Sequence, residues 1–332
     1  MLNNNPILVV GAGSWGTALA LVLARNQNLT YLWDNDPQHS RNLSTQACNN
    51  RHLPGYAFPP NLSVSVDLAA SLQQVEDIVI AAPCEGLLDI LDEMCRNTAR
   101  NLKICLVCKG LEPRTQSLNH QAVLDKLGDI PVAVLSGPSF AAEVAAGLPT
   151  AVTVAAENDD VARYFSARFH SDVFRVYTQN DIVGVQIGGA VKNVMAIAAG
   201  IADGLGFGAN TRAALITRGL AEITRLGVAM GGRQETFMGL AGLGDLVLTC
   251  TDNQSRNRRL GLALAAGKSL DEARQEIGQV VEGVKTAEVV PSLAQKYKIE
   301  MPISEQIFKV IHGESTPAEA VQALLAREAK SE

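Results

Sequence analysis

Lys192 lies in a long apolar segment and is the only charged residue between positions 182 and 202. Burial among apolar side chains disfavours the ammonium form of a lysine, so its pKa falls and the amine can act as a general base. A structural lysine that reaches a carboxylate is the alternative interpretation. Small residues on the same helical face predict room for a ligand beside the amine, and the residue after the lysine offers a hydrogen-bonding partner. These residues are Gly188, Gly189, Ala196 and Ala199, with Asn193 as the partner.

A glycine-rich cluster followed by arginines spans residues 239–259, with the sequence GLAGLGDLVLTCTDNQSRNRR. Its glycines permit a close approach of the backbone, and Asp245 follows them directly. Ser255 can cap the helix that follows, which would place Arg256 and Asn257 at a helix N-terminus, a position suited to a phosphate. A solvated arginine face is the alternative, but in a chain with a net charge of -6 we favour a local anion site.

A turn near the start of the sequence has the spacing GxGxxG and lies between an apolar strand and a helix. Its glycines are Gly11, Gly13 and Gly16. The first permits a tight turn, the second lets the backbone approach a pyrophosphate, and the third allows the helix to pack closely. The helix N-terminus then offers N–H groups to the phosphates. This context predicts a dinucleotide site, with a purely structural glycine turn as the alternative.

Asp34 lies at the end of the second expected strand, where an acid would bind the 2′-hydroxyl of the adenosine ribose. This position favours NAD. The next residue, Asn35, is not basic, although Arg41, Arg51 or His52 could reach a 2′-phosphate from a loop. A solvated turn is the alternative interpretation of this segment, and the choice between NAD and NADP stays open.

Two further turns of small residues follow expected strands. Lys109 comes directly after a strand that ends at position 108, and the next strand ends in a turn that contains Gly137, Ser139 and Ala141. Ligands of open α/β sheets bind at the carboxyl ends of the strands, so these turns together predict one crevice. Ordinary surface turns are the alternative.

The elements that must position these residues change character near residue 180. Apolar strands rich in Val and Ile alternate with helical patterns up to about residue 178, which predicts a mostly parallel sheet covered on both faces, a doubly wound Rossmann-type α/β fold. The expected strands are 7–10, 30–33, 78–82, 104–108, 132–135 and 151–155, and the first expected helix is 17–25. Only helical periodicity follows, at 181–203, 211–226, 256–266, 270–277, 286–296, 304–311 and 317–329.

The chain is therefore expected to have two domains, as its length of 332 residues also suggests. Residues 1–180 would form the dinucleotide-binding domain, and residues 181–332 an all-helical domain that binds the substrate and carries the catalytic groups.

Composition argues against several classes of partner. The net charge of -6 disfavours binding to nucleic acid or to an anionic membrane. The apolar segment 182–202 has a lysine near its middle, so a buried helix is favoured over a membrane span. The six cysteines show no disulfide pattern, which favours the cytoplasm, and the CxxC pair Cys105 and Cys108 has no second pair of ligands for a metal ion.

With these residues identified, the chain closely resembles the bacterial NAD(P)-dependent glycerol-3-phosphate dehydrogenase family over nearly its whole length. The resemblance rests on GAGSWGTALA, CKGLE, SGPSFAAEVAAGLPTA, GGAVKNVMAIAAGI, GQVVEG and the cluster at 239–259. It implies the reversible conversion of dihydroxyacetone phosphate to sn-glycerol 3-phosphate, which feeds glycerophospholipid synthesis. It also implies a homodimer, because the helical domains of such enzymes often form one.

The resemblance also implies residue roles. Lys192 would be the proton acceptor in the oxidation direction, with Lys109 and Asp245 orienting the substrate. The implied substrate contacts are Lys109, Gly137, Ser139, Lys192, Asp245, Ser255, Arg256 and Asn257. The implied cofactor contacts, in addition to Gly11, Gly13 and Gly16, are Ser14, Trp15, Asn35, Lys109, Ala141, Arg256, Val280 and Glu282. Many relatives carry Arg or His at position 35, which leaves a preference for NADP in doubt.

Two rival functions remain at this stage. A β-hydroxyacid dehydrogenase also has a lysine on a helix, but usually with Asn four positions later, where this chain has Ala196. A dinucleotide sensor without catalysis would give Lys109, Lys192, Asp245 and Arg256 no obvious purpose.

Overall fold

The computed structural model describes residues 5–97 and 101–328. The chain divides into two compact units, Met1–Cys108 with Ser117–Ile182, and Lys109–Gln116 with Val183–Glu332. We call these the first unit and the second unit. The chain thus enters the second unit at Lys109, returns to the first at Ser117, and leaves it again after Ile182. The division expected near residue 180 does not include the excursion at 109–116.

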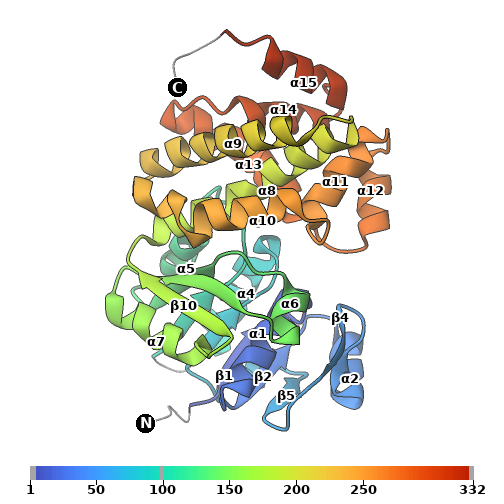
Figure 1. Cartoon of the computed structure of the whole chain (residues 1–332). Coiled ribbons are helices and arrows are strands. Elements are labelled where there is room, and N and C mark those ends of the chain that lie inside the picture. The colour runs from blue at the N-terminus through green and yellow to red at the C-terminus, as the bar shows by residue number, and fades with distance from the viewer. Residues whose placement is uncertain (1–4, 98–100, 329–332) are drawn as a thin grey trace. The chain divides into compact units, whose positions relative to one another are not determined.

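An eight-stranded sheet forms the centre of the first unit (Figure 1). Its order is β10-β9-β8-β7-β6-β1-β2-β5, and neighbouring strands are parallel except for β8 and β9. The strands are β1 (Ile7–Val10), β2 (Thr30–Trp33), β5 (Leu62–Ser65), β6 (Asp77–Ile80), β7 (Lys103–Leu106), β8 (Val132–Ser136), β9 (Thr150–Ala155) and β10 (Phe174–Gln179). The predicted fold class, a mostly parallel Rossmann-type sheet followed by helices, is confirmed.

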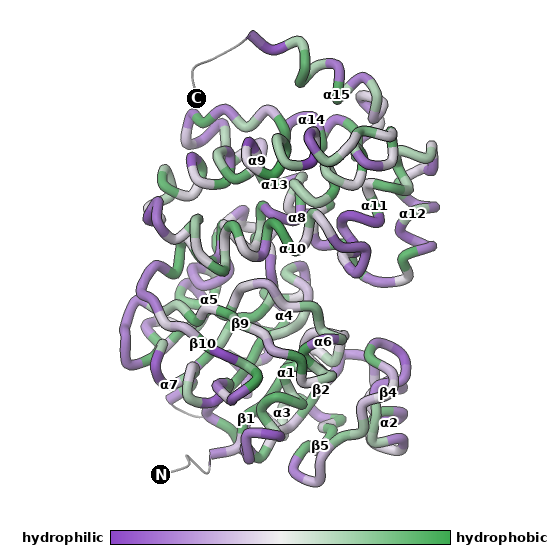
Figure 2. Tube along the Cα trace, in the orientation of Figure 1, coloured by the Kyte–Doolittle hydropathy of each residue, from purple (hydrophilic) through white to green (hydrophobic). Residues whose placement is uncertain are grey.

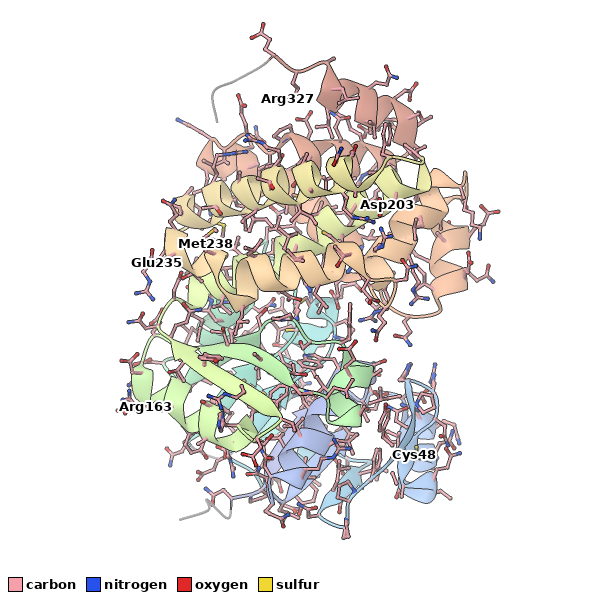
Figure 3. All side chains as sticks on the ribbon, viewed as in Figure 1. Cys48, Arg163, Asp203, Glu235, Met238 and Arg327 are labelled. Atoms are coloured by element: carbon pink, nitrogen blue, oxygen red, sulfur yellow. The ribbon has the colours of Figure 1, made fainter. Side chains whose placement is uncertain are left out.

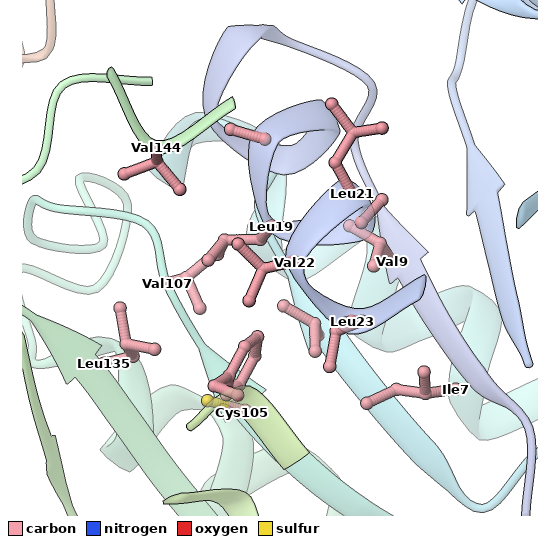
Figure 4. Packing of buried hydrophobic residues seen from close by; sticks show 14 of the residues in the cluster. Ile7, Val9, Leu19, Leu21, Val22, Leu23, Cys105, Val107, Leu135 and Val144 are labelled. Atoms are coloured by element: carbon pink, nitrogen blue, oxygen red, sulfur yellow. The ribbon is translucent and has the colours of Figure 1, made fainter. Parts of the chain in front are cut away.

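The central strands and the first helix form the core of this unit because nearly all of their side chains are apolar (Figure 2). Strands β1 and β6 are buried along their whole length. Leu19, Val22 and Leu23 of helix α1 (Ser14–Arg25) pack among side chains of the sheet such as Val9 and Cys105 (Figure 4). The rigid sheet holds the glycine turn between β1 and α1.

Two groups of helices accompany the sheet. Helix α1 contacts α6 (Ala141–Ala146) and α7 (Asp159–Phe169), whereas α4 (Leu87–Asn97) contacts α3 (Leu68–Leu72) and α5 (Asn119–Leu127). Helix α2 (Pro37–Gln46) contacts β5 and the small antiparallel pair β3 (Cys48–Asn49) and β4 (Leu53–Ala57). A short 3-10 turn, Cys84–Gly86, precedes α4.

The strands β3, β4, β5 and β10 are missing from the sequence-based expectation. Strand β4, with the sequence LPGYA, contains Pro and Gly and is mostly exposed, so it carries no strand pattern. Strand β10 lies at the edge of the sheet, and its sequence FRVYTQ has few apolar residues.

In the second unit, helices make up most of the described residues from Val183 on, whereas the segment Lys109–Gln116 is not helical. The helices are α8 (Ile182–Gly204), α9 (Ala209–Ala229), α10 (Asp245–Thr251), α11 (Arg256–Ala265), α12 (Leu270–Ile277), α13 (Glu282–Tyr297), α14 (Pro302–Ile311) and α15 (Pro317–Leu325), with a 3-10 turn at Gln234–Met238 and a π-helical turn at Leu240–Gly244. Helix α10 was not among the expected helices. The last expected helix, 317–329, ends at Leu325, and position 329 lies outside the described residues.

Helix α8 is long and apolar enough to cross a membrane by length and composition alone, but 94% of its most apolar window is buried inside the protein. This agrees with the predicted core helix. Close to its C-terminal end lies Asp203, which Figure 3 labels. Asp203 accepts hydrogen bonds from Arg212 of α9 and Arg258 of α11. These ion pairs join three helices at one point.

Two glycines of α8, Gly188 and Gly200, serve helix packing, so of the four small residues expected to leave room for a ligand Gly188 instead packs against the chain. A Cβ atom on Gly188 would lie 2.7 Å from the carbonyl oxygen of Ala241, in the π-helical turn. A Cβ atom on Gly200 would lie 2.1 Å from the carbonyl oxygen of Arg258. A Cβ atom on Gly261 of α11 would likewise lie 2.1 Å from the carbonyl oxygen of Ile197. Helices α8 and α11 therefore cross at a distance that only glycine permits.

Candidate active site

Two lysines share one buried carboxylate in the second unit. The Lys192 Nζ donates to Asp245 Oδ1 at 2.5 Å, and the Lys109 Nζ donates to Asp245 Oδ2 at 2.8 Å. The side chains of Asp245 and Lys192 are 1% and 7% exposed, while that of Lys109 is 16% exposed. Each lysine thus holds a different oxygen of the carboxylate, and the site places two amine side chains against a single carboxylate.

Helix α10 positions the carboxylate. Asp245 is its first residue, and the preceding π-helical turn brings the chain against the 3-10 turn so closely that a Cβ atom on Gly242 would lie 2.1 Å from the Phe237 carbonyl oxygen. One helical turn later, Thr249 Oγ1 accepts a hydrogen bond from Lys192 Nζ at 2.6 Å and donates to the Asp245 carbonyl oxygen at 2.6 Å. Thr249 is thus a site residue that the sequence analysis missed, although its i+4 spacing from Asp245 was a usable signal.

Burial lowers the pKa of Lys192 from 10.5 to about 8. The negative charge of Asp245 raises this pKa and the positive charge of Lys109 lowers it, so the loss of solvation outweighs the ion pair. A lysine with this pKa can both donate and accept a proton near neutral pH. The predicted lowered pKa of Lys192 is confirmed, and so is its pairing with a carboxylate, which the sequence analysis treated as an alternative.

A chain of carboxamides connects the lysines to helices α11 and α13. Asn193 Nδ2 donates to the Lys109 carbonyl oxygen at 3.3 Å, and Asn257 Nδ2 donates to Asn193 Oδ1 at 2.9 Å. Asn257 Oδ1 in turn accepts from the Gly283 backbone N–H at 2.9 Å. Since Asn193 adjoins Lys192 and Asn257 adjoins Arg256, this chain fixes the arginine helix beside the lysine helix.

The N-terminus of helix α11 has the predicted form. Ser255 Oγ accepts a hydrogen bond from the Arg258 N–H at 3.2 Å, so Ser255 caps the helix and Arg256 is its first residue. Burial lowers the pKa of Arg256 below its ordinary value, with Glu282 acting in the opposite direction. Among the described residues Arg256 forms no ion pair, and its nearest hydrogen-bonding partner is Gln279 Oε1 at 3.4 Å. A partly desolvated guanidinium at a helix N-terminus suits an anionic group.

The other two residues of this region that the resemblance implied as cofactor contacts lie just before and at the start of α13. Val280 is 45% exposed, and Glu282 is the first residue of the helix. The hydrogen bond from the Gly283 N–H to Asn257 ties this segment to the carboxamide chain.

The glycine turn of the first unit fits a dinucleotide. Gly11 has a φ of +110°, and a Cβ atom on Gly16 would lie 1.9 Å from the Gly11 carbonyl oxygen, so the first and third glycines are required by the backbone. A Cβ atom on Gly13 would meet nothing within 4 Å, which leaves open space in front of the second glycine. Gly13 is the N-cap residue of helix α1, and no side-chain hydrogen bond caps this helix. These features are those of a phosphate cradle.

The side chains around this turn are held by the rest of the first unit. Ser14 Oγ donates to the His52 carbonyl oxygen at 2.7 Å, and Trp15 Nε1 donates to the Val107 carbonyl oxygen at 3.1 Å. Asn35 is exposed beyond strand β2.

The turn after strand β8 holds the remaining predicted residues. Gly137 has a φ of +147°, and a Cβ atom there would lie 2.9 Å from the Val152 Cα atom. The backbone conformation and the packing therefore both favour glycine at this position. Ser139 Oγ donates to the Gly137 carbonyl oxygen at 3.0 Å, and Ala141 begins helix α6. Contact of these residues with a substrate or cofactor stays a prediction.

The structure brings Lys109, Lys192 and Asp245 into direct contact and links them to Asn257 and, through it, to the start of α13. The predicted residues of the glycine turn and of the turn after β8 belong to the first unit.

The CxxC cysteines and possible metal ligands can also be examined in the structure. Burial raises the pKa of Cys105 well above its ordinary value, which disfavours the reactive thiolate. Within residues 5–97 and 101–328, no group of three or more His, Cys, Asp or Glu side chains could hold a metal ion.

Comparison with protein families gives two matches that together span most of the chain. The N-terminal model of NAD-dependent glycerol-3-phosphate dehydrogenase matches residues 6–162, and the C-terminal model matches residues 181–322.

Individual relatives agree with these matches. A glycerol-3-phosphate dehydrogenase [NAD(P)+] of Nitrosococcus oceani is 55% identical over 326 residues, which cover 98% of this chain and 95% of that protein. The protein of the same name from Photobacterium profundum is 50% identical over 99% of this chain and 98% of its own length. The crystal structure of glycerol-3-phosphate dehydrogenase from Coxiella burnetii has a TM-score of 0.95 at 49% identity, covering 98% of this chain and 99% of that one.

Proposed function

The chain belongs to the NAD-dependent glycerol-3-phosphate dehydrogenase family and is an oxidoreductase that uses a nicotinamide dinucleotide; from this premise we propose how its residues divide the work. Residues 1–180 bind the dinucleotide, and residues 181–332, together with Lys109, bind the substrate and move the proton. The reaction is the reversible reduction of dihydroxyacetone phosphate to sn-glycerol 3-phosphate.

The observation that carries this proposal is the contact of Lys192 and Lys109 with the two oxygens of Asp245. The bound nicotinamide supplies the hydride. Lys192 donates its proton to the substrate oxygen in reduction and accepts it in oxidation, as its lowered pKa allows. The net positive charge of the three side chains stabilises the negative charge that develops on that oxygen.

Thr249 and Asp245 aim the amine of Lys192. Both accept hydrogen bonds from its Nζ, so the third N–H remains for the substrate oxygen. Lys109 holds the other carboxylate oxygen and keeps Asp245 from turning. Lys109 also contacts substrate and cofactor in this proposal.

The phosphate of the substrate binds at the start of α11. Ser255, Arg256 and Asn257 offer a helix N-terminus and a largely desolvated guanidinium, which donates a hydrogen bond to the Gln279 amide oxygen. Binding energy from this remote phosphate then fixes the reacting carbon near Lys192, where it raises the rate. Gly137 and Ser139 supply further substrate contacts.

Gly11, Gly13 and Gly16 form the phosphate cradle of the dinucleotide, as their backbone conformations support. The proposed contacts also include Ser14, Trp15, Asn35 and Ala141 of the first unit. Arg256, Val280 and Glu282 of the second unit complete the set.

Three properties of the whole protein are part of the proposal. The chain acts in the cytoplasm, supplies glycerol 3-phosphate for glycerophospholipid synthesis, and forms a homodimer. It needs no metal ion and binds neither nucleic acid nor membranes.

The test follows the oxidation of the reduced cofactor by absorbance in the presence of dihydroxyacetone phosphate. We expect turnover by the unchanged chain, and a kcat about a thousandfold lower in Lys192→Ala with nearly unchanged cofactor affinity. Lys268→Ala is the matched control, because Lys268 is exposed and pairs with Glu276 on α12. Near-normal turnover of Lys192→Ala would remove Lys192 from its role.

The two rival functions give different results in the same assay. A β-hydroxyacid dehydrogenase would oxidise a hydroxyacid and leave dihydroxyacetone phosphate unchanged. A dinucleotide sensor would bind the cofactor and show no turnover with either substrate.

A further inference from the structure

The segment after strand β2 contains two carboxylates, Asp34 and Asp36, and no basic residue between them. In a doubly wound sheet the acid at this position faces the ribose of the adenosine half of the cofactor. NAD and NADP differ there by a single phosphate on the 2′-oxygen. The charges around this segment therefore decide which of the two forms is accepted, and this question rests on the function proposed above.

The carboxylate of Asp34 is fixed in place by the backbone. Its Oδ2 accepts the Ala12 N–H of the glycine turn at 3.0 Å, and its Oδ1 accepts the Asp36 N–H at 3.0 Å. The Asp34 carbonyl oxygen also accepts the Ser40 hydroxyl at 3.2 Å. A carboxylate has about four lone-pair positions, so both oxygens can still accept a ribose hydroxyl. A 2′-phosphate, however, would meet a negative charge that cannot turn away without breaking its bond to the glycine turn.

Asp36 adds a second negative charge and closes a helix end that a phosphate could otherwise use. It is the N-cap of α2, and its Oδ1 accepts the N–H groups of His39 at 3.2 Å and Gln38 at 2.9 Å. The hydrogen bond from the His39 N–H is the main reason that the pKa of Asp36 lies below its ordinary value, so Asp36 stays ionised. These N–H groups are the ones that would bind a phosphate at this helix N-terminus.

The nearby arginines are already engaged. Arg51 Nη1 forms an ion pair with Asp36 Oδ2 at 3.0 Å, and Arg41 Nη2 donates to Gln38 Oε1 at 3.2 Å. Residue 35, between the two acids, is Asn. Two negative and two positive side chains thus leave no excess positive charge at this place.

We propose that Asp34 makes this chain selective for NAD(H) over NADP(H), with Asp36 and the absence of a basic side chain at position 35 supporting the selection. The 2′-hydroxyl of the adenosine ribose donates to the fixed carboxylate. The 2′-phosphate is rejected by the charge of Asp34 and by the blocked N-terminus of α2.

The experiment compares both cofactors in two independent measurements. Steady-state kinetics with dihydroxyacetone phosphate give kcat/KM for NADH and NADPH, and fluorescence titration without substrate gives the two dissociation constants. We expect NADH to be favoured at least about tenfold in both, the ratio that corresponds to about 1.4 kcal/mol.

Variants assign the selectivity to Asp34. Asp34→Asn removes the charge and keeps a carbonyl acceptor for one of the two backbone N–H groups, those of Ala12 and Asp36, and we expect the NADH to NADPH ratio to fall about tenfold. Asp34→Ser combined with Asn35→Arg should reverse the preference. Asp67→Ser is the matched control, since Asp67 caps helix α3 of the same unit by accepting the Ala70 N–H, and it should leave the ratio unchanged.

The outcomes separate this inference from the proposed function. Equal or tighter binding of NADPH by the unchanged chain, or an unchanged ratio in Asp34→Asn, would overturn the selectivity while the dehydrogenase activity stands. Failure to reduce dihydroxyacetone phosphate with either cofactor would instead overturn the proposed function, and the binding constants would still decide the question of selectivity.

Discussion

At the scale of single residues, the protonation of Lys192 results from two opposing influences. Loss of solvent around its amine lowers the pKa to about 8, while Asp245 acts in the other direction. The folded value is below the ordinary value of 10.5, so the neutral amine is favoured once the pH rises above about 8. Below that pH the ammonium is the main form, and it is the proton donor for reduction.

The pH dependence of the two directions should therefore be opposite. We expect kcat for oxidation of glycerol 3-phosphate to rise, and kcat for reduction of dihydroxyacetone phosphate to fall, as the pH increases through about 8. Initial rates between about pH 6 and about pH 10 in both directions measure this. Lys192→Arg is the control, because a guanidinium does not titrate in this range and its residual rates should show no inflection there. Parallel pH profiles in the two directions would contradict the assignment.

Thr249 is a positioning residue whose effect can be isolated. Thr249→Val removes the oxygen that accepts from Lys192 Nζ at 2.6 Å, so the ammonium loses one of its partners. We expect kcat to fall about tenfold and the pH inflection to move below that of the unchanged protein, because hydrogen bonds to charged groups contribute about 1.5–3 kcal/mol.

Thr251→Val provides the matched control in the same helix. Thr251 Oγ1 donates to the Val247 carbonyl oxygen at 2.8 Å, the same local bond that Thr249 makes with Asp245, but Thr251 is exposed. An equal change in both variants would show that Thr249 acts only through the helix.

Residue chemistry was the part of the site most accessible from sequence. The burial of a lysine in an apolar segment and the capping of a helix by a serine directly before Arg256 have local causes, and Lys192, Ser255 and Arg256 lie as expected. The partners across the fold were not accessible, because the contacts of Asp245 with Lys109 and of Asn193 with Asn257 depend on how the helices pack.

At the scale of elements, buried polar groups fix the order of the helices in the second unit. Helix α14 begins without a capping side chain of its own. Glu222 of α9 replaces it, accepting the Ile303 N–H at 2.7 Å and the Ser304 N–H at 3.2 Å, and it is 2% exposed. Burial raises the pKa of Glu222, and these hydrogen bonds partly oppose that shift.

Removing this interhelical cap should destabilise the protein. Glu222→Ala leaves buried N–H groups without an acceptor, and we expect the free energy of unfolding to fall by about 2–4 kcal/mol. Thermal and urea unfolding measure the change. Glu319→Ala is the control, because Glu319 belongs to an exposed capping box at α15 and its loss should cost about 0.5–1 kcal/mol. Equal losses in the two variants would show that the burial of Glu222 has no added effect.

The elements that sequence patterns predicted are those with a strong apolar signal, such as β1 and α8. Helix α10 was missed because GLAGLG indicates a loop, and the π-helical turn that allows Asp245 to begin a helix depends on its contact with Phe237. The pair β3 and β4 was missed because it pairs only with itself and includes Pro and Gly.

At the scale of the whole molecule, charge predicts how the chain behaves toward membranes. The net charge is -6 and the isoelectric point is about 5.5. We expect the protein to stay in the supernatant when it is centrifuged with phosphatidylglycerol vesicles, because like charges repel and no excess of Lys and Arg offsets this. Sedimentation with phosphatidylglycerol vesicles but not with phosphatidylcholine vesicles would contradict the expectation.

The excursion of Lys109–Gln116 into the second unit restricts how such a protein can be recombined. In a chimera with one junction, after Ile182, the first half would come from another protein, and residues 109–116 with it. Asp245 would then lose Lys109, one of its two lysine partners, unless the other protein has an equivalent lysine. Exchange of the nucleotide-binding half for one without an equivalent lysine therefore requires that residues 109–116 be kept with the helices. The residues that carry the proposed chemistry therefore come from two separate stretches of the sequence, 109–116 and 183–332.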